Sequence, residues 1–399
     1  MTATLADRTD RRLRTSAVVA LAFGAFSYVT AETLPIGLLP QISSGLSVSE
    51  ASVGLLMTTY AAVAGLTAIP FTALTAHVPR HRLIMGCLAI FTVSQVCAAL
   101  APSFAVLALS RLVAALAHGV FWSVLAPVAA RLAPPGQAAR ATSLVFVGNS
   151  VALLAGVPIG TAIGQLTNWR TSFAVMGLAG AVATVLLMRL LPDLPSTAAR
   201  IRPTVRVAAA FTVLRDRSVA AVCAVTMVVV IGHFAAYTYI APIARHAGGL
   251  SGLAVSALLL GYGMAGILGN LVAGHAADSR PRRGLAMCVG VVVVSLAALA
   301  IGPGTVGTVL AVLGWGIGFT AIPVSLQSAA MRVAPDAHEA SSAVYVVAFQ
   351  IGIGGGALVG DRLVASGHLG VLPTAAAIAA LAALGLVFAS RKAFPSRVA

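Results

Sequence analysis

Apolar residues dominate the chain in long unbroken runs, and short polar stretches separate these runs. An α-helix of about 20 apolar residues is long enough to cross the ~30 Å hydrocarbon core of a bilayer. The runs lack the alternation of apolar and polar positions that a membrane β-barrel requires. The pattern therefore predicts an all-α integral membrane protein with twelve transmembrane helices. These helices are expected at 15–39, 51–75, 83–101, 104–130, 141–166, 171–191, 218–243, 253–276, 284–302, 305–331, 340–364 and 371–390.

Basic residues are distributed very unevenly between the two ends of these helices. If the N-terminus lies in the cytoplasm, 21 of the 25 lysines and arginines fall on the cytoplasmic side, 3 fall outside, and Arg111 lies within a helix. Cytoplasmic segments of membrane proteins carry such an excess of positive charge. The basic start at 11–14 is similar to that of a signal peptide, but the apolar run after it is too long and lacks a convincing cleavage site. We therefore expect a retained first helix and both termini in the cytoplasm.

Composition excludes several classes of protein. The 399 residues are 59% hydrophobic and only 9% charged, with a mean hydropathy of +0.99. Soluble domains have about 25% charged residues, so an ordinary soluble enzyme or DNA-binding protein is excluded. The net charge of +15 could suggest a nucleic-acid partner. The one-sided placement of the basic residues explains this charge instead, so we expect no nucleic-acid partner.

The chain lacks the common motifs of catalytic and metal sites. Its four cysteines have neither metal-ligand nor redox-motif spacing. Lys392 is its only lysine, which excludes a phosphate-binding loop of the Walker A type. Neither H-E-x-x-H nor G-x-S-x-G occurs. We therefore expect no metal, no cofactor and no enzymatic activity; a membrane-embedded enzyme is the disfavoured alternative.

The twelve runs divide into two similar halves. We expect an N-terminal six-helix half at 1–191, a cytoplasmic linker at 192–216 that is rich in proline and arginine, and a C-terminal six-helix half at 217–399. Arg131-Leu132-Ala133-Pro134 recurs 201 residues later as Arg332-Val333-Ala334-Pro335, and the Pro-Arg sequence at 79–80 recurs at 281–282. Both repeats lie on the same side of the membrane, which indicates halves of parallel topology. Such halves are typical of transporters that bind their substrate between the halves near the middle of the membrane.

The loop between the eighth and ninth helices, Gly274-His275-Ala276-Ala277-Asp278-Ser279-Arg280-Pro281-Arg282-Arg283, resembles the G-x-x-x-D-x-x-G-R-R motif of the major facilitator superfamily. In the equivalent loop of the first half, Arg80 and Arg82 remain, but Ala76 stands where the family has aspartate. The resemblance implies the major facilitator fold. It also implies a gating role for these loops, which the missing aspartate puts in doubt for the first one. The expected gating residues are Arg80, Arg82, Gly274, Asp278, Arg282 and Arg283.

Within this superfamily the chain is most similar to the drug:proton antiporter-1 family, and there to sugar efflux transporters. The sequences that carry this resemblance are Thr30-Ala31-Glu32-Thr33-Leu34-Pro35, His118-Gly119-Val120-Phe121-Trp122 after Arg111, and Ala236-Tyr237-Thr238-Tyr239-Ile240. Gly156, Pro158 and Gly160 in the fifth helix partly match the antiporter motif. The resemblance implies proton-coupled efflux of a neutral sugar, such as arabinose or a related glycoside, across the inner membrane.

Candidate proton-coupling residues stand out because charges within the predicted spans are rare. Glu32 is the one acid well inside a span, and Arg111 is the one base. A charge at the bilayer centre costs about 2.5–3.5 kcal/mol even on insertion scales, which makes each a functional candidate. His118 follows Arg111 by seven residues and shares its helical face. We expect Glu32, Arg111 and His118 to couple transport to protons. The alternative is structural: a permanently paired carboxyl, and an arginine bound to a backbone carbonyl.

Neutral polar and aromatic residues are the candidates for substrate binding. An uncharged polyol needs hydrogen-bond donors and acceptors rather than a counter-ion, and tryptophan can stack on the apolar face of a sugar. The same residues could instead pack helices together. The candidates are Tyr28, Trp122, Asn149, His233, Tyr237, Trp315, Gln327 and Gln350.

Partners and rival functions follow from this interpretation. The expected partners are a small-molecule substrate, protons and membrane lipid, and the chain is expected to be a monomer. A multidrug, chloramphenicol-type or nucleoside exporter is the rival within the same class. A receptor or scaffold that transports nothing is the rival outside it.

Overall fold

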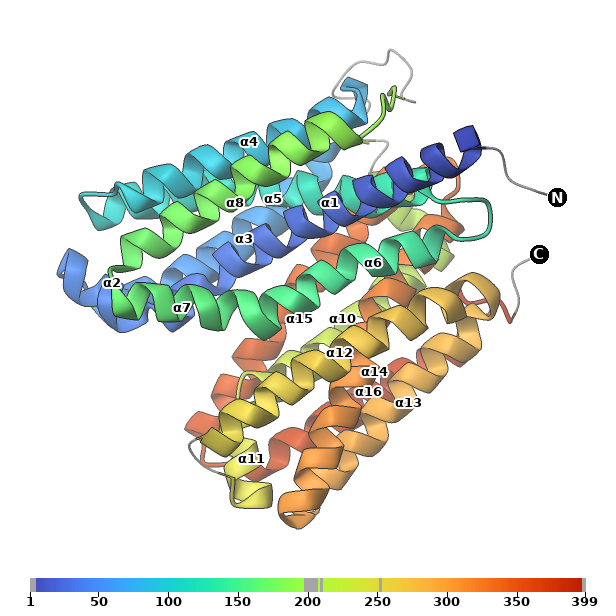
Figure 1. Cartoon of the computed structure of the whole chain (residues 1–399). Coiled ribbons are helices and arrows are strands. Elements are labelled where there is room, and N and C mark those ends of the chain that lie inside the picture. Colours follow the sequence, from blue (N-terminus) through green and yellow to red (C-terminus); the bar gives the residue numbers. More distant parts are fainter. Residues whose placement is uncertain (1–4, 197–206, 209–210, 251–252, 397–399) are drawn as a thin grey trace. The chain divides into compact units, whose positions relative to one another are not determined.

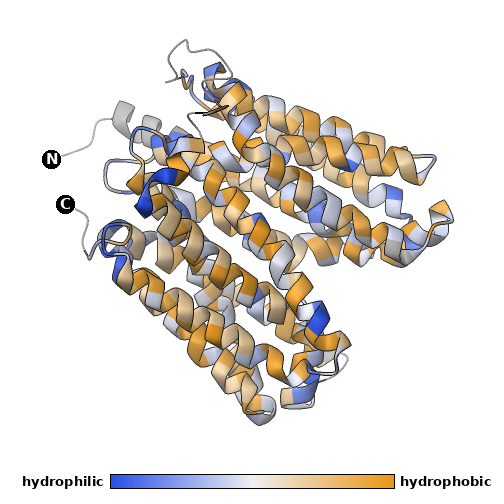
Figure 2. Cartoon of the chain, turned by 180° about the vertical axis from the view of Figure 1, so that it is seen from behind, coloured by the Kyte–Doolittle hydropathy of each residue, from blue (hydrophilic) through white to orange (hydrophobic). Residues whose placement is uncertain are grey.

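The computed structural model describes residues 5–196, 207–208, 211–250 and 253–396. The described part of the chain is helical, and twelve of its helices are long and apolar enough to cross a membrane, as predicted. Apolar residues cover the sides of these helices, while hydrophilic residues gather at helix ends and in the connecting loops (Figure 2). The protein is thus a multi-pass membrane protein.

The chain forms two compact units, residues 1–211 and 212–399, and each contains six of the twelve spans. Unit 1 contains α1 (Leu5–Gly37), α2 (Leu39–Leu46), α3 (Glu50–Leu74), α4 (Arg80–Ala99), α5 (Phe104–Leu132), α6 (Ala138–Val151), α7 (Val157–Leu166) and α8 (Trp169–Leu190). Unit 2 contains α10 (Arg217–Tyr237), α11 (Ile240–Gly248), α12 (Leu253–Ser279), α13 (Pro281–Ala300), α14 (Gly304–Val333), α15 (His338–Ala365) and α16 (Leu372–Ala389). Figure 1 shows the order of these helices.

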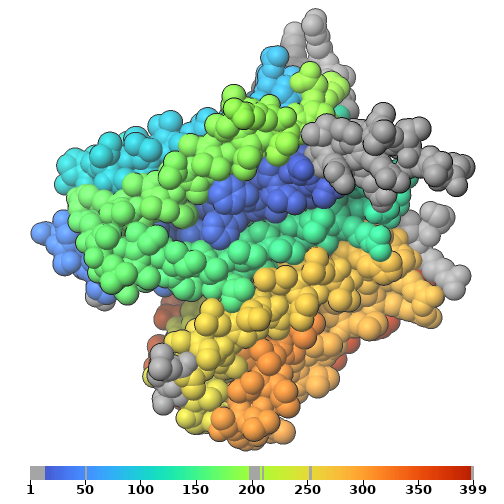
Figure 3. All heavy atoms as spheres, viewed as in Figure 1, coloured from blue at the N-terminus to red at the C-terminus, as the bar shows by residue number. Residues whose placement is uncertain are grey.

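In unit 1, α1 packs against both α6 and α8, and α5 packs against α3 and α4. Figure 3 shows part of α1 at the surface, as a blue band between α8 and the α6–α7 span. In unit 2, α14 packs against α12 and α13, and α10 packs against α15 and α16. Glycine allows several of these close approaches. At Gly148, for example, a Cβ atom would collide with the carbonyl oxygen of Ala22 on α1.

The first and seventh spans end earlier than the hydrophobic pattern predicts. They were expected to reach residues 39 and 243, but α1 ends at Gly37 and α10 at Tyr237, and a short helix follows each. Pro40 and Pro242 lie in the first turns of these short helices, α2 and α11. Proline is tolerated there because the first N–H groups of a helix have no intrahelical partner.

A strap at residues 191–196 follows the last helix of unit 1 and binds the start of α4. The Leu194 carbonyl accepts a hydrogen bond from the Arg80 N–H at 2.8 Å, and the Leu194 N–H donates to His81 Nδ1 at 3.2 Å. Ser196 Oγ donates to the Ala76 carbonyl at 2.7 Å. Because α4 has no side-chain N-cap, the strap satisfies a backbone donor that would otherwise lack a partner.

A second strap, at residues 390–396, does the same in unit 2. The Pro395 carbonyl accepts from the Arg282 N–H at 3.2 Å, and Arg282 Nε donates to the Phe394 carbonyl at 2.7 Å. Phe394 is buried, and α13, like α4, begins without a side-chain cap. The internal repeat therefore extends beyond the six helices of each half to the segment that follows them.

Candidate functional site

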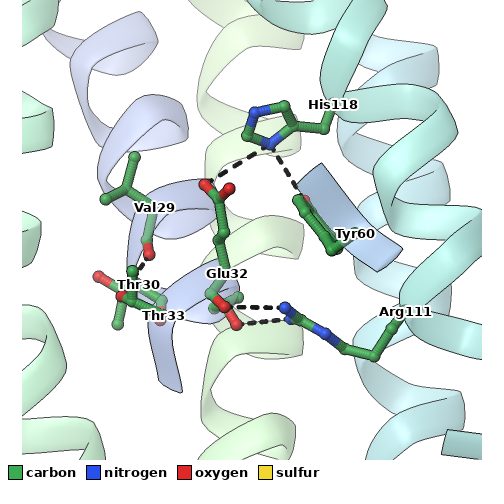
Figure 4. Close-up of polar contacts among 8 residues, drawn as sticks. Val29, Thr30, Glu32, Thr33, Tyr60, Arg111 and His118 are labelled. Atoms are coloured by element: carbon green, nitrogen blue, oxygen red, sulfur yellow. Dashed lines mark hydrogen bonds and ion pairs between the residues drawn. The ribbon is translucent and has the colours of Figure 1, made fainter. Parts of the chain in front are cut away.

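Three elements of unit 1 bring a carboxyl, an imidazole and a phenol together (Figure 4). Glu32 extends from α1, and its side chain keeps 16% of its exposure. His118 on α5 places Nδ1 4.0 Å from Glu32 Oε2. The Tyr60 hydroxyl on α3 lies 3.0 Å from the same nitrogen. His118 Nδ1 thus lies between one acid and one neutral hydroxyl.

Arg111 ties α5 to the backbone of α1 beside this group. Its guanidinium donates to the Ala31 carbonyl at 2.6 Å and to the Glu32 carbonyl at 2.8 Å. Pro35 explains why the first acceptor is free, since proline has no N–H to donate to the carbonyl four residues earlier. The guanidinium carbon also lies 4.5 Å from the centre of the Tyr60 ring, in a cation–π contact.

This geometry changes the role expected for Arg111. Its hydrogen bonds go to main-chain carbonyls, as in the structural alternative, and not to the Glu32 carboxylate. The positive charge still acts on the carboxylate through space. The side chain within ion-pair distance of the Glu32 carboxyl is His118, at 4.0 Å.

The hydrogen-bonding capacity of these groups allows a proton to change position. A neutral imidazole with a free Nδ1 accepts a hydrogen bond from the Tyr60 hydroxyl, whereas a protonated Nδ1 can donate to Glu32 or to the Tyr60 oxygen. The phenol can rotate to serve either state. The cluster can therefore hold one proton at the carboxyl or at the imidazole without leaving Tyr60 unpaired.

The glycine motif of the fifth span supports α1 next to Glu32. A π-helical turn at Ala152–Gly156 precedes Pro158, whose missing N–H leaves the Leu154 carbonyl without its usual partner. A Cβ atom at Gly156 would collide with Thr30 Oγ1, and one at Gly160 would lie 2.7 Å from Leu34. These glycines therefore let the fifth span pack closely against α1, both before and after Glu32 in the sequence.

The substrate candidates of unit 1 do not all lie in one place. Trp122 lies near His118, with ring centroids 6.0 Å apart, and Asn149 is half-buried on α6. The Tyr28 side chain is fully buried, and its hydroxyl donates to the Cys87 carbonyl at 2.8 Å. In this structure Tyr28 thus packs within unit 1, and its role in binding a solute stays a prediction.

In unit 2, an aromatic cluster contains three of the candidates. Trp315 Nε1 donates a hydrogen bond of 3.1 Å to His233 Nδ1. The His233 ring stacks on Phe319 with centroids 3.2 Å apart, and Tyr237 lies on its other side at 5.0 Å. Trp315 is fully buried, so its side chain acts on the cluster through its contact with His233.

The two glutamine candidates of unit 2 differ. Gln327 is buried, and its amide nitrogen donates to Ser342 Oγ at 2.7 Å. This bond ties α14 to α15, which is the helix-packing alternative expected for such residues. The Gln350 amide nitrogen is sealed from solvent and has no hydrogen-bond partner among the described residues.

The expected gating residues fall into two groups. The Arg80 guanidinium is buried and donates to the carbonyls of Thr75, Ala76 and Val78, so it closes its own loop. Arg282 binds the strap of unit 2, as described above. The other four hold varied positions: Arg82 and Arg283 are exposed, Asp278 is half-buried and Gly274 is buried.

Sequence reasoning missed Tyr60 and its repeat counterpart in unit 2. A shift of 202 residues relates Pro79-Arg80 to Pro281-Arg282, and the same shift relates Tyr60 to Tyr262. A comparison of the two halves position by position would have found this pair. Within the described residues, no cluster of three or more histidine, cysteine or acidic side chains could hold a metal ion.

Comparison with known proteins agrees with the fold. The model of the family "Major Facilitator Superfamily" matches residues 21–357. The human organic anion transporter MFSD10 (TETRAN) superposes with a TM-score of 0.76 at 15% identity, over 95% of this chain and 99% of its own. FucP in the outward conformation gives 0.74 at 16% identity, over 94% and 98%. A variant of the E. coli fucose:proton symporter FucP gives 0.73 at 16% identity, with the same coverage.

Proposed function

The chain belongs to the major facilitator superfamily, a family of membrane transporters, and from this premise we propose that it exports a small neutral solute in exchange for protons. The observation that carries the proposal is the contact of Glu32 with His118 in unit 1. Glu32 is the one acid expected deep within a span, and an acid inside the membrane marks an ion or proton path. Its carboxyl lies 4.0 Å from a second group that can take a proton.

In the proposed cycle, protonation changes the side-chain interactions of Glu32 and leaves the main-chain contacts of α1 unchanged. A proton from outside neutralises the Glu32 carboxylate and ends its attraction to Arg111. The two hydrogen bonds from Arg111 persist, because they bind the backbone of α1. The charge of the site therefore changes while α1 stays tied to α5. This change in charge biases the transporter between its two access states, and release of the proton inside accompanies binding of the next solute.

A neutral sugar, such as arabinose or a related glycoside, is the proposed cargo. The support is the sequence resemblance to sugar efflux transporters and the uncharged aromatic cluster of unit 2. One similar structure is named a fucose:proton symporter, and another an organic anion transporter, so the shared fold is compatible with different cargoes. The rival cargo is a lipophilic drug or a nucleoside, since aromatic walls without charge also suit flat apolar molecules. We place the protein in the inner membrane as a monomer with both termini in the cytoplasm.

Efflux from inverted membrane vesicles under an imposed pH gradient tests this function. The panel contains radiolabelled arabinose, a thiogalactoside, chloramphenicol, a nucleoside and a lipophilic cation. We expect gradient-driven accumulation of a neutral sugar that a protonophore abolishes. Accumulation of chloramphenicol or of the cation, without any sugar, would replace the sugar proposal with the drug-exporter one. Sugar transport that does not depend on the pH gradient would exclude proton coupling.

A further inference from the structure

The internal repeat places an uncharged cluster in unit 2 where unit 1 has its acid–base cluster. The shift of 201 residues that relates Arg131–Pro134 to Arg332–Pro335 places His233 at the position of Glu32 and Phe319 at that of His118. Tyr262 corresponds to Tyr60, as described above. The same three places in the fold thus hold a carboxyl, an imidazole and a phenol in one unit, and an imidazole, a phenyl ring and a phenol in the other.

One consequence concerns Tyr262. In unit 1 the hydroxyl of Tyr60 binds His118, but in unit 2 the repeat has phenylalanine in place of that histidine. Tyr262 is 4% exposed, and its hydroxyl has no hydrogen-bond partner in the described part of the chain. The hydroxyl is not sealed from solvent, so it can bind a molecule that is not part of the described residues.

A second consequence concerns the protonation of His233. The indole of Trp315 can only donate, and it donates to His233 Nδ1. That nitrogen must carry a lone pair, so the neutral ring has its proton on Nε2. A second proton on Nδ1 would set two donors against each other and break the contact. Trp315 therefore keeps His233 neutral and leaves Nε2–H as its one free donor.

The surroundings of His233 supply no charge. Its ring contacts come from Phe234 and Tyr237 on its own helix and from Trp315 and Phe319 on α14. Tyr262 on α12 contacts the Tyr237 and Trp315 rings. α15 has no titratable side chain between Tyr345 and Asp361, and α16 has none along its length. Among these described residues of unit 2, a charged ligand would thus find no counter-ion.

We propose that this aromatic cluster is the part of unit 2 that recognises the solute, with His233 Nε2–H and the hydroxyls of Tyr237 and Tyr262 as its hydrogen-bonding groups and Trp315 as the residue that positions His233. The three polar atoms have no partner among the described residues, and none of them is sealed from solvent. Two phenols and one imidazole N–H match the donors and acceptors of a polyhydroxylated ring, and the aromatic faces match its C–H surface. The inference rests on the proposed function for its cargo, a neutral sugar, and assigns to His233 a donor role rather than proton transfer.

The protonation of His233 can be measured without any ligand. In full-length protein labelled with 15N-histidine and reconstituted in nanodiscs, the His233→Gln variant assigns the signals of that ring. We expect a neutral ring protonated at Nε2 that stays unchanged from pH 8 to pH 5.5. In Trp315→Phe the freed Nδ1 should let the neutral ring exchange between its Nδ1–H and Nε2–H tautomers. A native His233 that carries its proton on Nδ1, or is charged at pH 7, would overturn the assignment.

Binding measurements test the recognition role separately. Arabinose is titrated into the native protein, His233→Gln, His233→Asn, Tyr262→Phe and the matched control Tyr345→Phe, whose hydroxyl binds the Pro323 carbonyl elsewhere in unit 2. A lost neutral hydrogen bond should weaken binding about two- to twelve-fold. We expect this loss in Tyr262→Phe and His233→Asn. We expect little loss in His233→Gln, whose amide nitrogen reaches the Nε2 position, and none in the control. In Trp315→Phe, arabinose affinity should fall, because the ring no longer holds its proton at Nε2 alone.

The outcomes separate this inference from the proposed function. If arabinose binds and is exported, but Tyr262→Phe and His233→Asn bind it like the native protein, the aromatic cluster is not the recognition site and the efflux proposal stands. If no sugar in the transport panel binds while tetraphenylphosphonium binds tightly and independently of the Tyr262 hydroxyl, the polar recognition role is overturned together with the sugar cargo. Sugar binding lost on the pattern predicted above supports the cluster even if transport shows no dependence on protons.

Discussion

Arg111 on α5 donates a hydrogen bond of 2.6 Å to the main-chain carbonyl of Ala31 on α1, and Pro35 leaves that carbonyl free. A proline in one helix thus creates the acceptor for a buried cation of another helix. Such a cation needs partners because an unpaired charge inside a protein is strongly destabilising. The tie between α1 and α5 is therefore independent of whether the neighbouring Glu32 carboxyl is charged.

The first prediction concerns this tie. The single nitrogen of Arg111→Lys cannot take the places of both guanidinium nitrogens, and bonds that involve a charged group are worth about 1.5–3 kcal/mol each. We expect a loss of stability of that order for purified protein in denaturant unfolding. Pro35→Ala restores an N–H that competes for the Ala31 carbonyl, so the two substitutions should be non-additive by more than about 0.5 kcal/mol. Additive effects would show that Pro35 does not govern the contact.

The second prediction concerns Glu32. Glu32→Gln keeps the size of the protonated side chain and removes the charge change. Gradient-driven efflux should therefore collapse, while exchange of solute without a gradient should survive. The matched control is Asp361→Asn, an acid of unit 2 whose carboxyl contacts the Tyr239 hydroxyl at 3.4 Å, and it should transport normally. Full gradient-driven efflux by Glu32→Gln would exclude Glu32 from coupling.

The third prediction concerns the glycine motif. A methyl group at Gly156 would meet Thr30 Oγ1 and would lie 2.9 Å from the ring of Phe26. Gly156→Ala should therefore push α7 away from α1 and reduce transport, at a stability cost of about 1–3 kcal/mol for overpacking. Gly54→Ala is the control, because no heavy atom lies within 4 Å of the added methyl. Equal transport by both variants would show that transport does not depend on the close packing at Gly156.

The fourth prediction concerns pH and the start of α10. Asp216 accepts hydrogen bonds from the N–H groups of Ser218 at 2.7 Å and Val219 at 3.2 Å, and these bonds lower its pKa from its ordinary value of 3.8. Because the folded-state pKa is the lower one, this stabilisation is complete above about pH 4 and is lost as the pH falls through the folded value. Asp216→Ala should cost about 1 kcal/mol at pH 7. Asp216→Asn should retain the cap and flatten the acid dependence of the melting temperature.

The fifth prediction concerns orientation. In a chain without its native cysteines, Arg200→Cys and Pro395→Cys should resist a membrane-impermeant thiol reagent in intact cells, because the distribution of basic residues places both in the cytoplasm. Ser366→Cys, in the loop before the last span, should be labelled as the outside control. Rapid labelling at 200 or 395 would reverse the proposed orientation.

The twelve spans could be predicted because a bilayer requires about 20 apolar residues for each. The ends of the first and seventh helices could not, since hydropathy continues through Pro40 and Pro242 into the short helices that follow. Glu32 and His118 were candidates because polar residues within spans are rare. Tyr60 was not, because its place beside His118, 58 residues later in the chain, depends on how α3 packs against α5. The acceptor of Arg111 could not be predicted for another reason: it is a main-chain carbonyl, which every residue has. Only the proline four residues later indicates that this carbonyl is free.

The straps have a consequence for how this chain can be encoded. Each begins where the sixth span of its unit ends and binds the third span of the same unit. A gene divided between the codons for residues 197 and 211 would yield two polypeptides, each with its own strap. Co-expression of such fragments, or duplication of one of them, becomes a practical route to transporters with two independently altered halves.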